Sequence, residues 1–160
     1  MPKIKKQAVT LDELDRRILN QLQSNSRLSN AELAKRVHTS APTCLRRVRR
    51  LYETGVITKE VALINPELLG PMVTAICEIN LENQSDEALS DFEEHVTQSP
   101  KVLQCYRVSP GPDFVLIAQL SDMSGYRELA KQLFASSHNI RSVRTFFSVH
   151  CSKFETAIPV

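Results

Sequence analysis

The chain has no tryptophan and few cysteines, and those cysteines lack the spacing of a metal or redox site. They lie far apart, at Cys44, Cys77, Cys105 and Cys151. A zinc site or a C-x-x-C redox motif needs cysteines paired at short spacing, and a small disulfide scaffold needs a higher cysteine content. We therefore expect four reduced thiols, most of them buried as small hydrophobic side chains, and no bound metal.

Long apolar segments are also missing. The N-terminal segment MPKIKKQAVT is basic, but no apolar stretch long enough for a signal peptide follows it, and no run approaches the ~20 residues of a membrane span. We therefore expect a cytoplasmic protein that does not contact a membrane. A composition of 42% hydrophobic and 24% charged residues excludes a fully disordered or collagen-like chain. At 160 residues, one or two domains are possible.

The net charge of +2 conceals an asymmetry between the two parts of the chain. Residues 1–60 hold 13 Lys or Arg against 6 Asp or Glu, a net charge of +7. Residues 61–160 hold 7 against 12, a net charge of −5. Such a difference indicates that the basic part binds a polyanion while the acidic part has another task.

The first helix is predicted over residues 11–23. Thr10 and Glu13 have the spacing of a capping box, in which each side chain bonds to a free backbone amide of the first turn. Five apolar residues follow at helical spacing: Leu11, Leu14, Ile18, Leu19 and Leu22.

A second capping box, Ser29 with Glu32, predicts a short helix that ends near His38. One face of this helix carries Leu33, Ala34 and Val37.

The third helix is predicted over residues 41–54, with Ser40 as its N-cap, Pro42 in its first turn and Gly55 just beyond its end. Two short helices joined by a tight turn, with another helix beneath, form a helix-turn-helix. We expect four residues of the third helix to face the core: Cys44, Leu45, Val48 and Leu51. We expect the others to point largely outward: Thr43, Arg46, Arg47, Arg49 and Arg50.

This density of arginine suits DNA. Each phosphate contact releases counterions, and a guanidinium can bind guanine through two hydrogen bonds. The alternative is a solvated basic face on a structural helix, but the capped helix-turn-helix and the charge of +7 favour DNA. The residues predicted to contact DNA are Ser29, Asn30, Ser40, Ala41, Pro42, Thr43, Arg46, Arg47, Arg49 and Arg50.

Three segments occur in order in this region: LDELDRRILNQLQSNSRLSNAELAKRV, SAPTCLRRVRRL and TGVI. Together they resemble the DNA-binding domain of the Lrp/AsnC family, the bacterial and archaeal feast/famine transcription regulators. Two positions depart from the family pattern. His38 stands where members often have glycine, although histidine tolerates a left-handed conformation better than most residues. Arg46 stands where members often have an acidic residue, so a known operator sequence cannot be transferred to this chain.

The rest of the sequence predicts an α+β protein with a second domain. Residues 56–64, VITKEVALI, are predicted to form a strand, and NPELLGP marks the domain boundary. Strand, helix, strand, strand, helix and strand then follow, the last strand running from Ile140 to about Cys151. This order is the ferredoxin-like βαββαβ sandwich, an antiparallel sheet with both helices on one face. The predicted limits are a basic tail at 1–9, a winged-helix-like helix-turn-helix domain at 10–64, a linker at 65–71 and a sensing and assembly domain at 72–160.

The last strand carries apolar residues on both faces, which predicts that the face without helices meets another subunit. The resemblance implies the same: family members pair as homodimers through this sheet, and four dimers commonly form an octamer. It also implies an amino-acid effector, bound where dimers meet and near the loop between the second and third strands. The candidate effector residues are Ser109, Pro110, Gly111, Pro112, Asp113, Met123, Ser148 and His150.

The loop departs from the family pattern at Pro110 and Gly111, where members often have glycine and an acidic residue. Asp113 remains as the carboxylate expected to bind the effector's ammonium, because a buried ammonium needs acceptors. With no acid at position 111, a cationic side chain on the ligand would lack a partner, so an uncharged amino acid, leucine or methionine, is favoured. The alternative is a proline-stiffened hairpin that binds nothing.

Other functions are less well supported by the sequence. Histidines at 38, 95, 138 and 150 are scattered and no catalytic or nucleotide-binding motif is present, so we expect neither an enzyme nor a cofactor. An RNA-binding module with this strand order would need a basic sheet and a specific aromatic motif, which the acidic part lacks. The expected function is a sequence-specific transcriptional regulator of amino-acid metabolism or nutrient response. A global DNA-organising, nucleoid-type protein stays open as the alternative.

Overall fold

The computed structural model describes residues 9–135 and 139–160, and the chain divides into two units. One unit ends at Leu63 and takes in the C-terminal segment Lys153–Val160, and the other is Ile64–Ser152. Residues 72–160 were predicted to form one domain, whereas Lys153–Val160 groups with the first unit. The predicted tail at 1–9, except for Val9, and His138 lie outside the described residues.

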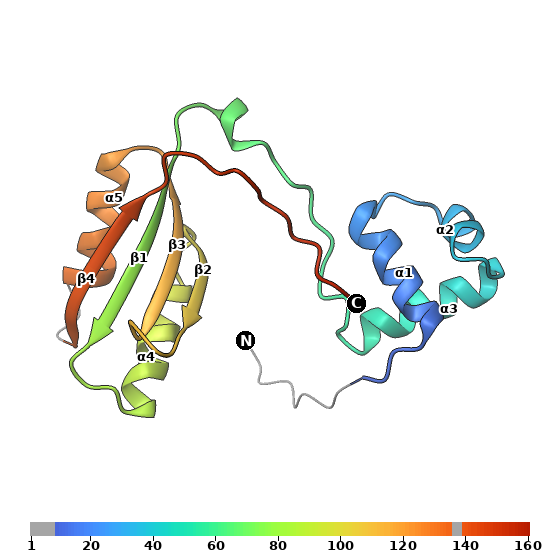
Figure 1. Ribbon diagram of the computed structural model, residues 1–160, viewed down its shortest axis with the longest axis horizontal. Helices are drawn as coiled ribbons and strands as arrows, with labels where there is room; N and C mark the ends of the chain where they lie inside the picture. Colours follow the sequence, from blue (N-terminus) through green and yellow to red (C-terminus); the bar gives the residue numbers. More distant parts are fainter. Residues whose placement is uncertain (1–8, 136–138) are drawn as a thin grey trace. The chain divides into compact units, whose positions relative to one another are not determined.

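The described part of the first unit contains three helices, α1 (Glu13–Ser24), α2 (Asn30–Arg36) and α3 (Ala41–Glu53), which Figure 1 labels. The predicted caps of α2 and α3, Ser29 and Ser40, are confirmed. His38 in the turn between them has φ 56°, and Gly55 beyond α3 has φ 74°, both left-handed as expected. The helices enclose one apolar cluster: Ile18, Leu19, Leu33, Ala34, Val37, Cys44 and Leu51.

The predicted cap of α1 was wrong by two residues. The capping box is formed by Asp12 and Asp15, whose backbone N–H groups each donate to the other's carboxylate, at 2.9 and 3.2 Å. The spacing is the same as that of Thr10 and Glu13, and sequence spacing alone does not choose between them.

The predicted strand at residues 56–64 is absent. Ile57 N–H donates to Leu51 O at 3.0 Å and closes the end of α3, and the segment beyond it has no regular structure until the short 3-10 turn Pro66–Leu69. Val61, Leu63 and Ile64 are 59–65% exposed. The physical reason is the lack of a partner: a strand is stabilised by a neighbouring strand, and no described segment pairs with this one. The helix-turn-helix therefore has no β-wing among the described residues.

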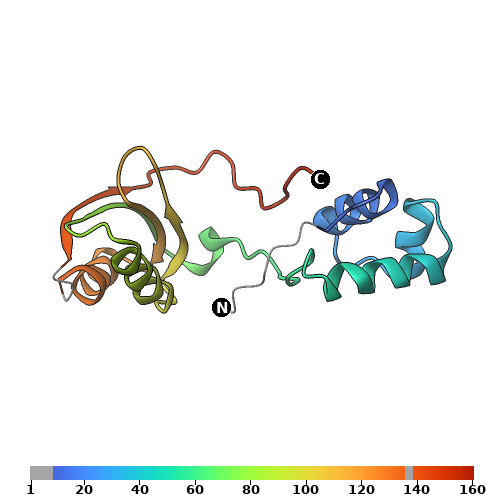
Figure 2. The same cartoon turned by 90° about the horizontal axis from the view of Figure 1, so that it is seen from below.

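The second unit follows the predicted order: β1 (Val73–Leu81), α4 (Asp86–Thr97), β2 (Val102–Arg107), β3 (Phe114–Leu120), α5 (Met123–Ala130) and β4 (Ile140–Phe147). The sheet order is β2-β3-β1-β4 and every pairing is antiparallel. Figure 2 shows both helices on one face of this sheet. The last strand ends at Phe147 and not at about Cys151, although Ser148 N–H still donates to Thr74 O at 2.9 Å.

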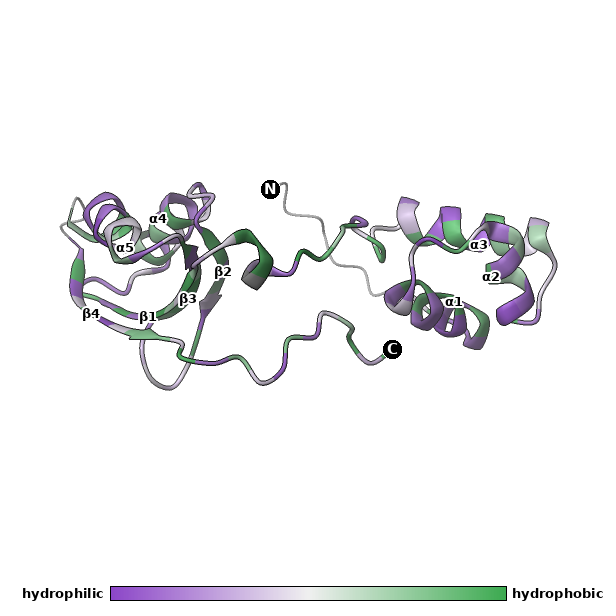
Figure 3. Ribbon diagram, turned by 90° about the horizontal axis from the view of Figure 1, so that it is seen from above, coloured by the Kyte–Doolittle hydropathy of each residue, from purple (hydrophilic) through white to green (hydrophobic). Residues whose placement is uncertain are grey.

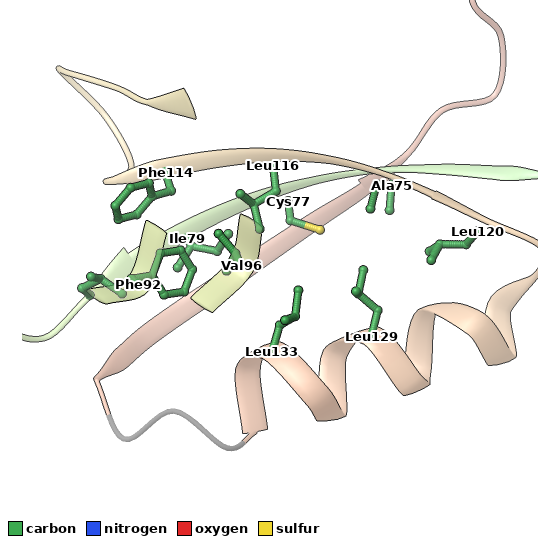
Figure 4. Packing of buried hydrophobic residues seen from close by; sticks show 12 residues of the cluster. Ala75, Cys77, Ile79, Phe92, Val96, Phe114, Leu116, Leu120, Leu129 and Leu133 are labelled. Carbon is green, nitrogen blue, oxygen red and sulfur yellow. The ribbon is translucent and has the colours of Figure 1, made fainter. Parts of the chain in front are cut away.

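The core of the second unit lies between the sheet and the helices (Figure 4). Alternate residues of β1 point into it, as the period of two requires: Ala75, Cys77, Ile79 and Leu81. Phe92 of α4 packs against Phe114 of β3 with ring centroids 4.8 Å apart, and Leu129 and Leu133 cover the other half of the sheet. Of the four free cysteines, Cys44 and Cys77 are buried, Cys105 is half-buried and Cys151 is exposed.

We predict that Leu116→Ala lowers the free energy of unfolding by about 2–5 kcal/mol, because Leu116 is buried in this core and its loss leaves a cavity. The matched change Leu103→Ala, at a side chain 61% exposed on the edge strand β2, should cost less than about 0.5 kcal/mol. Urea denaturation followed by circular dichroism measures both, and equal losses would contradict the described core.

Candidate DNA-binding surface and effector region

The exposed part of α3 begins at its N-terminus. Ser40 Oγ accepts the Thr43 N–H at 3.4 Å, and its hydroxyl donates to Thr43 Oγ1 at 2.9 Å. Ala41 and Pro42 lie in the same first turn, and Pro42 is exposed. The predicted residues of this turn are therefore brought together at the end of the helix that would meet base edges.

Ser29 and Asn30 hold the helix-turn-helix together. Asn30 Nδ2 donates to Ala41 O at 2.8 Å and so connects the start of α2 to the start of α3. Ser29 Oγ donates to Glu32 Oε2 at 2.6 Å as part of the capping box. Both side chains were predicted to contact DNA, and in this structure both are engaged within the unit.

Arg46 and Arg49 are exposed on α3. They line an open depression of about 410 Å³ whose other lining residues are Arg47, Arg50 and Glu53. In Figure 3 hydrophilic and hydrophobic residues alternate along α3, as expected for a helix with one buried face. A surface lined by four guanidinium groups favours a polyanion such as the DNA backbone.

The other two arginines of α3, Arg47 and Arg50, form ion pairs with acidic residues at the start of α1. Arg47 Nη1 lies 2.6 Å from Asp12 Oδ2 and 3.3 Å from Asp15 Oδ1, and Arg50 Nη2 lies 3.0 Å from Asp15 Oδ2. Their side chains are 25% and 40% exposed. The expectation that they point outward was wrong. They form, with Asp12 and Asp15, what we call the Asp15 cluster.

Asp15 is completely buried, which explains why two arginines are drawn to it. A buried carboxylate is costly unless it is paired and hydrogen-bonded. The same contacts shift neighbouring groups: the Asp15 N–H, with smaller help from Arg47, lowers the pKa of the Asp12 carboxyl. The hydrogen bond to Asp12 raises the pKa of Arg47. The Asp15 cluster therefore fixes α3 against α1.

Leu45 was predicted to face the core and is instead 49% exposed on α3. Its neighbour Cys44 takes the buried position, and successive residues of a helix point about 100° apart. Leu45 was not predicted among the DNA-binding residues because its apolar character indicated burial. An exposed apolar side chain next to the exposed Arg46 is suited to contact a thymine methyl group.

The candidate effector loop is a hairpin between β2 and β3, closed by Val108 N–H donating to Asp113 O at 3.1 Å. The Asp113 side chain is held by hydrogen bonds to neighbouring residues of the same unit. Its Oδ2 accepts the Leu81 N–H at 2.7 Å and the Gln84 Nε2–H at 3.2 Å, and its own N–H donates to Ile79 O at 2.9 Å. The Asp113 carboxylate thus holds the end of β1, a role that its place in the sequence did not predict.

The candidate effector residues do not come together within one chain. The loop Ser109–Asp113 lies at the end of the sheet where β1 finishes. Met123 follows the far end of β3, and Ser148 pairs with Thr74 at the start of β1. Because β3 contains seven residues, these two ends are roughly 20 Å apart.

The face of the sheet opposite the helices carries an apolar stripe with one charged pair. The strand registers place five apolar side chains there: Ile76, Tyr106, Val115, Ile117 and Phe146. Tyr106 and Phe146 are 51% and 46% exposed. Arg144 forms an ion pair with Glu78 and lies over the Phe146 ring, 5.2 Å from its centroid. We call these seven residues the open face.

Comparison with known proteins identifies both units. Residues 11–58 match a family model described as winged helix-turn-helix DNA-binding, and residues 74–158 match the Lrp/AsnC ligand binding domain. The chain belongs to the Lrp/AsnC family. This confirms the resemblance carried by the sequence motifs, and the chain is an Lrp/AsnC-type DNA-binding transcriptional regulator.

Three relatives illustrate the similarity. A leucine-responsive regulatory protein of Rhizobium meliloti is 38% identical, over 88% of this chain and 90% of the relative. An AsnC family regulator from Agrobacterium tumefaciens, 36% identical, superposes with a TM-score of 0.86 over 93% of this chain and 97% of its own. A Neisseria meningitidis regulator solved with L-Met, 31% identical, gives 0.84 over 94% and 97%.

The described residues of this Lrp/AsnC chain were searched for a cluster of metal-ligating side chains and for a helix able to span a membrane. The described part holds no group of three or more His, Cys, Asp or Glu side chains placed to bind a metal ion. No helix of the described ranges has both the length and the apolar content needed to cross a membrane.

We predict that Asp15→Asn lowers the free energy of unfolding by about 3 kcal/mol, the lower end for breaking a buried ion pair, because both arginines reach solvent. Glu13→Gln removes the same charge from an exposed neighbour in α1 and should cost less than about 0.5 kcal/mol. Denaturant titration compares the two variants. A loss for Asp15→Asn no larger than for Glu13→Gln would show that the Asp15 cluster does not hold α3.

Proposed function

We propose that this Lrp/AsnC regulator recognises specific DNA sequences and controls genes of amino-acid metabolism or nutrient response, with leucine or methionine as its effector. The observation that carries the DNA-binding part is the exposed surface of α3, where the first turn, Leu45, Arg46 and Arg49 share solvent access. The effector part is supported by two relatives, one named for its response to leucine and one solved with L-Met. No catalytic role or cofactor is proposed.

The DNA contacts are divided among the arginines of α3. Arg46 and Arg49 contact bases or phosphates directly, and the residues of the first turn, Ser40 to Thr43, lie at the base edges. Arg47 and Arg50 act mainly by holding α3 in place, and their remaining exposure lets them add to the positive potential. Ser29 and Asn30 position α2 across the DNA backbone, with their side chains engaged inside the unit.

Assembly is proposed to occur through the open face. Its exposed apolar residues would be covered by a second copy in a homodimer, and dimers would associate further, as an octamer in the expected form. The separation of the candidate effector residues supports a site between chains. Ser109–Asp113 of one chain and Met123, Ser148 and His150 of another can meet only when two chains are in contact.

The role of Asp113 changes the proposed chemistry of that site. Its carboxylate already accepts two hydrogen bonds that hold the end of β1, so it orients the loop and adds negative charge near the ammonium. The N–H of Gly111 can donate to the effector carboxylate, whereas Pro110 and Pro112 have no N–H. An effector that binds between chains changes DNA affinity only by favouring one assembly over another.

We predict that Arg46→Ala and Arg49→Ala each weaken DNA binding and reduce the slope of log affinity against log salt by about 1, because one phosphate contact is lost. Both variants should unfold within about 0.5 kcal/mol of the unchanged protein. Arg141→Ala, an exposed arginine of the acidic unit, is the control for net charge. Gel shifts at several salt concentrations give the slopes. If all three variants bind alike, α3 does not contact DNA as proposed.

We predict that leucine or methionine, among the twenty amino acids, gives a calorimetric binding signal and changes the sedimentation coefficient or the DNA affinity of the full chain. Lysine is the control, because its cationic side chain lacks an acidic partner at Gly111. If no amino acid binds, the effector proposal fails. The alternative is then a DNA-organising protein, and footprinting would reveal several regularly spaced protected sites.

A further inference from the structure

The chain passes between its two units twice. It leaves the first unit after Leu63 and returns to it at Lys153, so that Lys153–Val160 belongs to the DNA-binding unit. We call Lys153–Val160 the C-terminal strap. One linker, the crossing after Leu63, is enough to join the two units. The return of the chain at Lys153 therefore needs a structural reason.

The strap is attached to α1 by a reciprocal pair of hydrogen bonds. Ile158 N–H donates to Gln23 Oε1 at 2.7 Å, and Gln23 Nε2–H donates to Ile158 O at 3.0 Å. A side-chain amide has both a donor and an acceptor, so Gln23 satisfies the Ile158 backbone as a neighbouring strand would. The Ile158 side chain is 66% exposed, which indicates that the backbone and not the side chain is recognised.

The end of the strap also joins the apolar core of the unit. Val160 is half-buried and packs against the cluster that contains Ile18, Leu19 and Leu51. Two interactions therefore hold the three-residue segment 158–160: the apolar burial of Val160 and the paired hydrogen bonds of the Ile158 backbone. Ile158 lies 135 residues from Gln23 in sequence, so the position of the segment is not a consequence of local chain geometry.

We propose that the α1 surface at Gln23 is a docking site for the C-terminal strap, and that the docked strap limits how the DNA-binding unit turns on the sensing unit. One linker lets a unit rotate about it, whereas two attachment points restrict that rotation. Paired recognition helices must match the spacing of operator half-sites, so restricted rotation sharpens the choice of spacing. The inference rests on DNA binding by α3 and does not need an effector.

Docking is tested on the full chain by hydrogen exchange and mass spectrometry. Ile158→Pro removes the N–H that donates to Gln23, and Ile158→Ala keeps it, so the two variants differ in the backbone donor. We expect amides of α1 to exchange about fivefold faster in Ile158→Pro than in Ile158→Ala, the factor expected for one hydrogen bond. Equal exchange in the two variants would overturn docking, and the measurement needs no DNA.

The effect on orientation is tested with DNA that carries two half-sites either in phase or shifted by about 5 base pairs, half a helical turn. We expect the intact chain to prefer the in-phase DNA by about a hundredfold. A chain ending at Ser152 should bind a single half-site normally and lose at least tenfold of that preference. An unchanged preference would overturn the role of the strap. If the shortened chain no longer binds a single half-site, its DNA-binding unit has failed. The preference for in-phase DNA is then measured on Ile158→Pro, which keeps the full length of the strap, and an unchanged preference in that variant overturns the role of the strap.

Discussion

The buried carboxylate of Asp15 is the constraint on which the DNA-binding unit depends. An ionised side chain with no exposure must be surrounded by donors, and here these are Arg47, Arg50 and the backbone N–H of Asp12. This requirement fixes α3 against α1 and uses two of the four arginines of α3. The surface left for DNA is smaller than the sequence indicates, and it is also better positioned, because the helix that carries it is held by charge-assisted bonds.

A comparable anchoring occurs in the sensing unit. Asp113 accepts the backbone N–H of Leu81 and so joins the β2–β3 loop to the end of β1. Both units thus place a carboxylate behind a proposed contact surface: Asp15 behind α3, proposed to contact DNA, and Asp113 behind the β2–β3 loop, proposed to contact the effector. In each unit the acidic residue holds the backbone geometry, and the neighbouring residues are the ones proposed to contact DNA or ligand.

Much of the fold could be predicted from the sequence, because it follows from local patterns. Alternating burial in β1 and the N-caps Ser29 and Ser40 each depend on a few neighbouring residues. The errors arose where distant partners decide. Arg47 turned inward because Asp15 lies on another helix, and residues 56–64 did not form a strand without a partner. Leu45 was expected to face the core together with Cys44 and is exposed. The contact of Ile158 with Gln23 leaves no signal in sequence spacing.

The open face has a consequence for how the protein behaves at different abundances. Tyr106 and Phe146 expose about half of their surface in a single chain, and apolar area of this kind is released from water only when a second surface covers it. If copies of the chain cover it for one another, folding and association are linked by mass action. The melting temperature would then rise with protein concentration, and a cell would alter the regulator's assembly simply by changing how much of it is made.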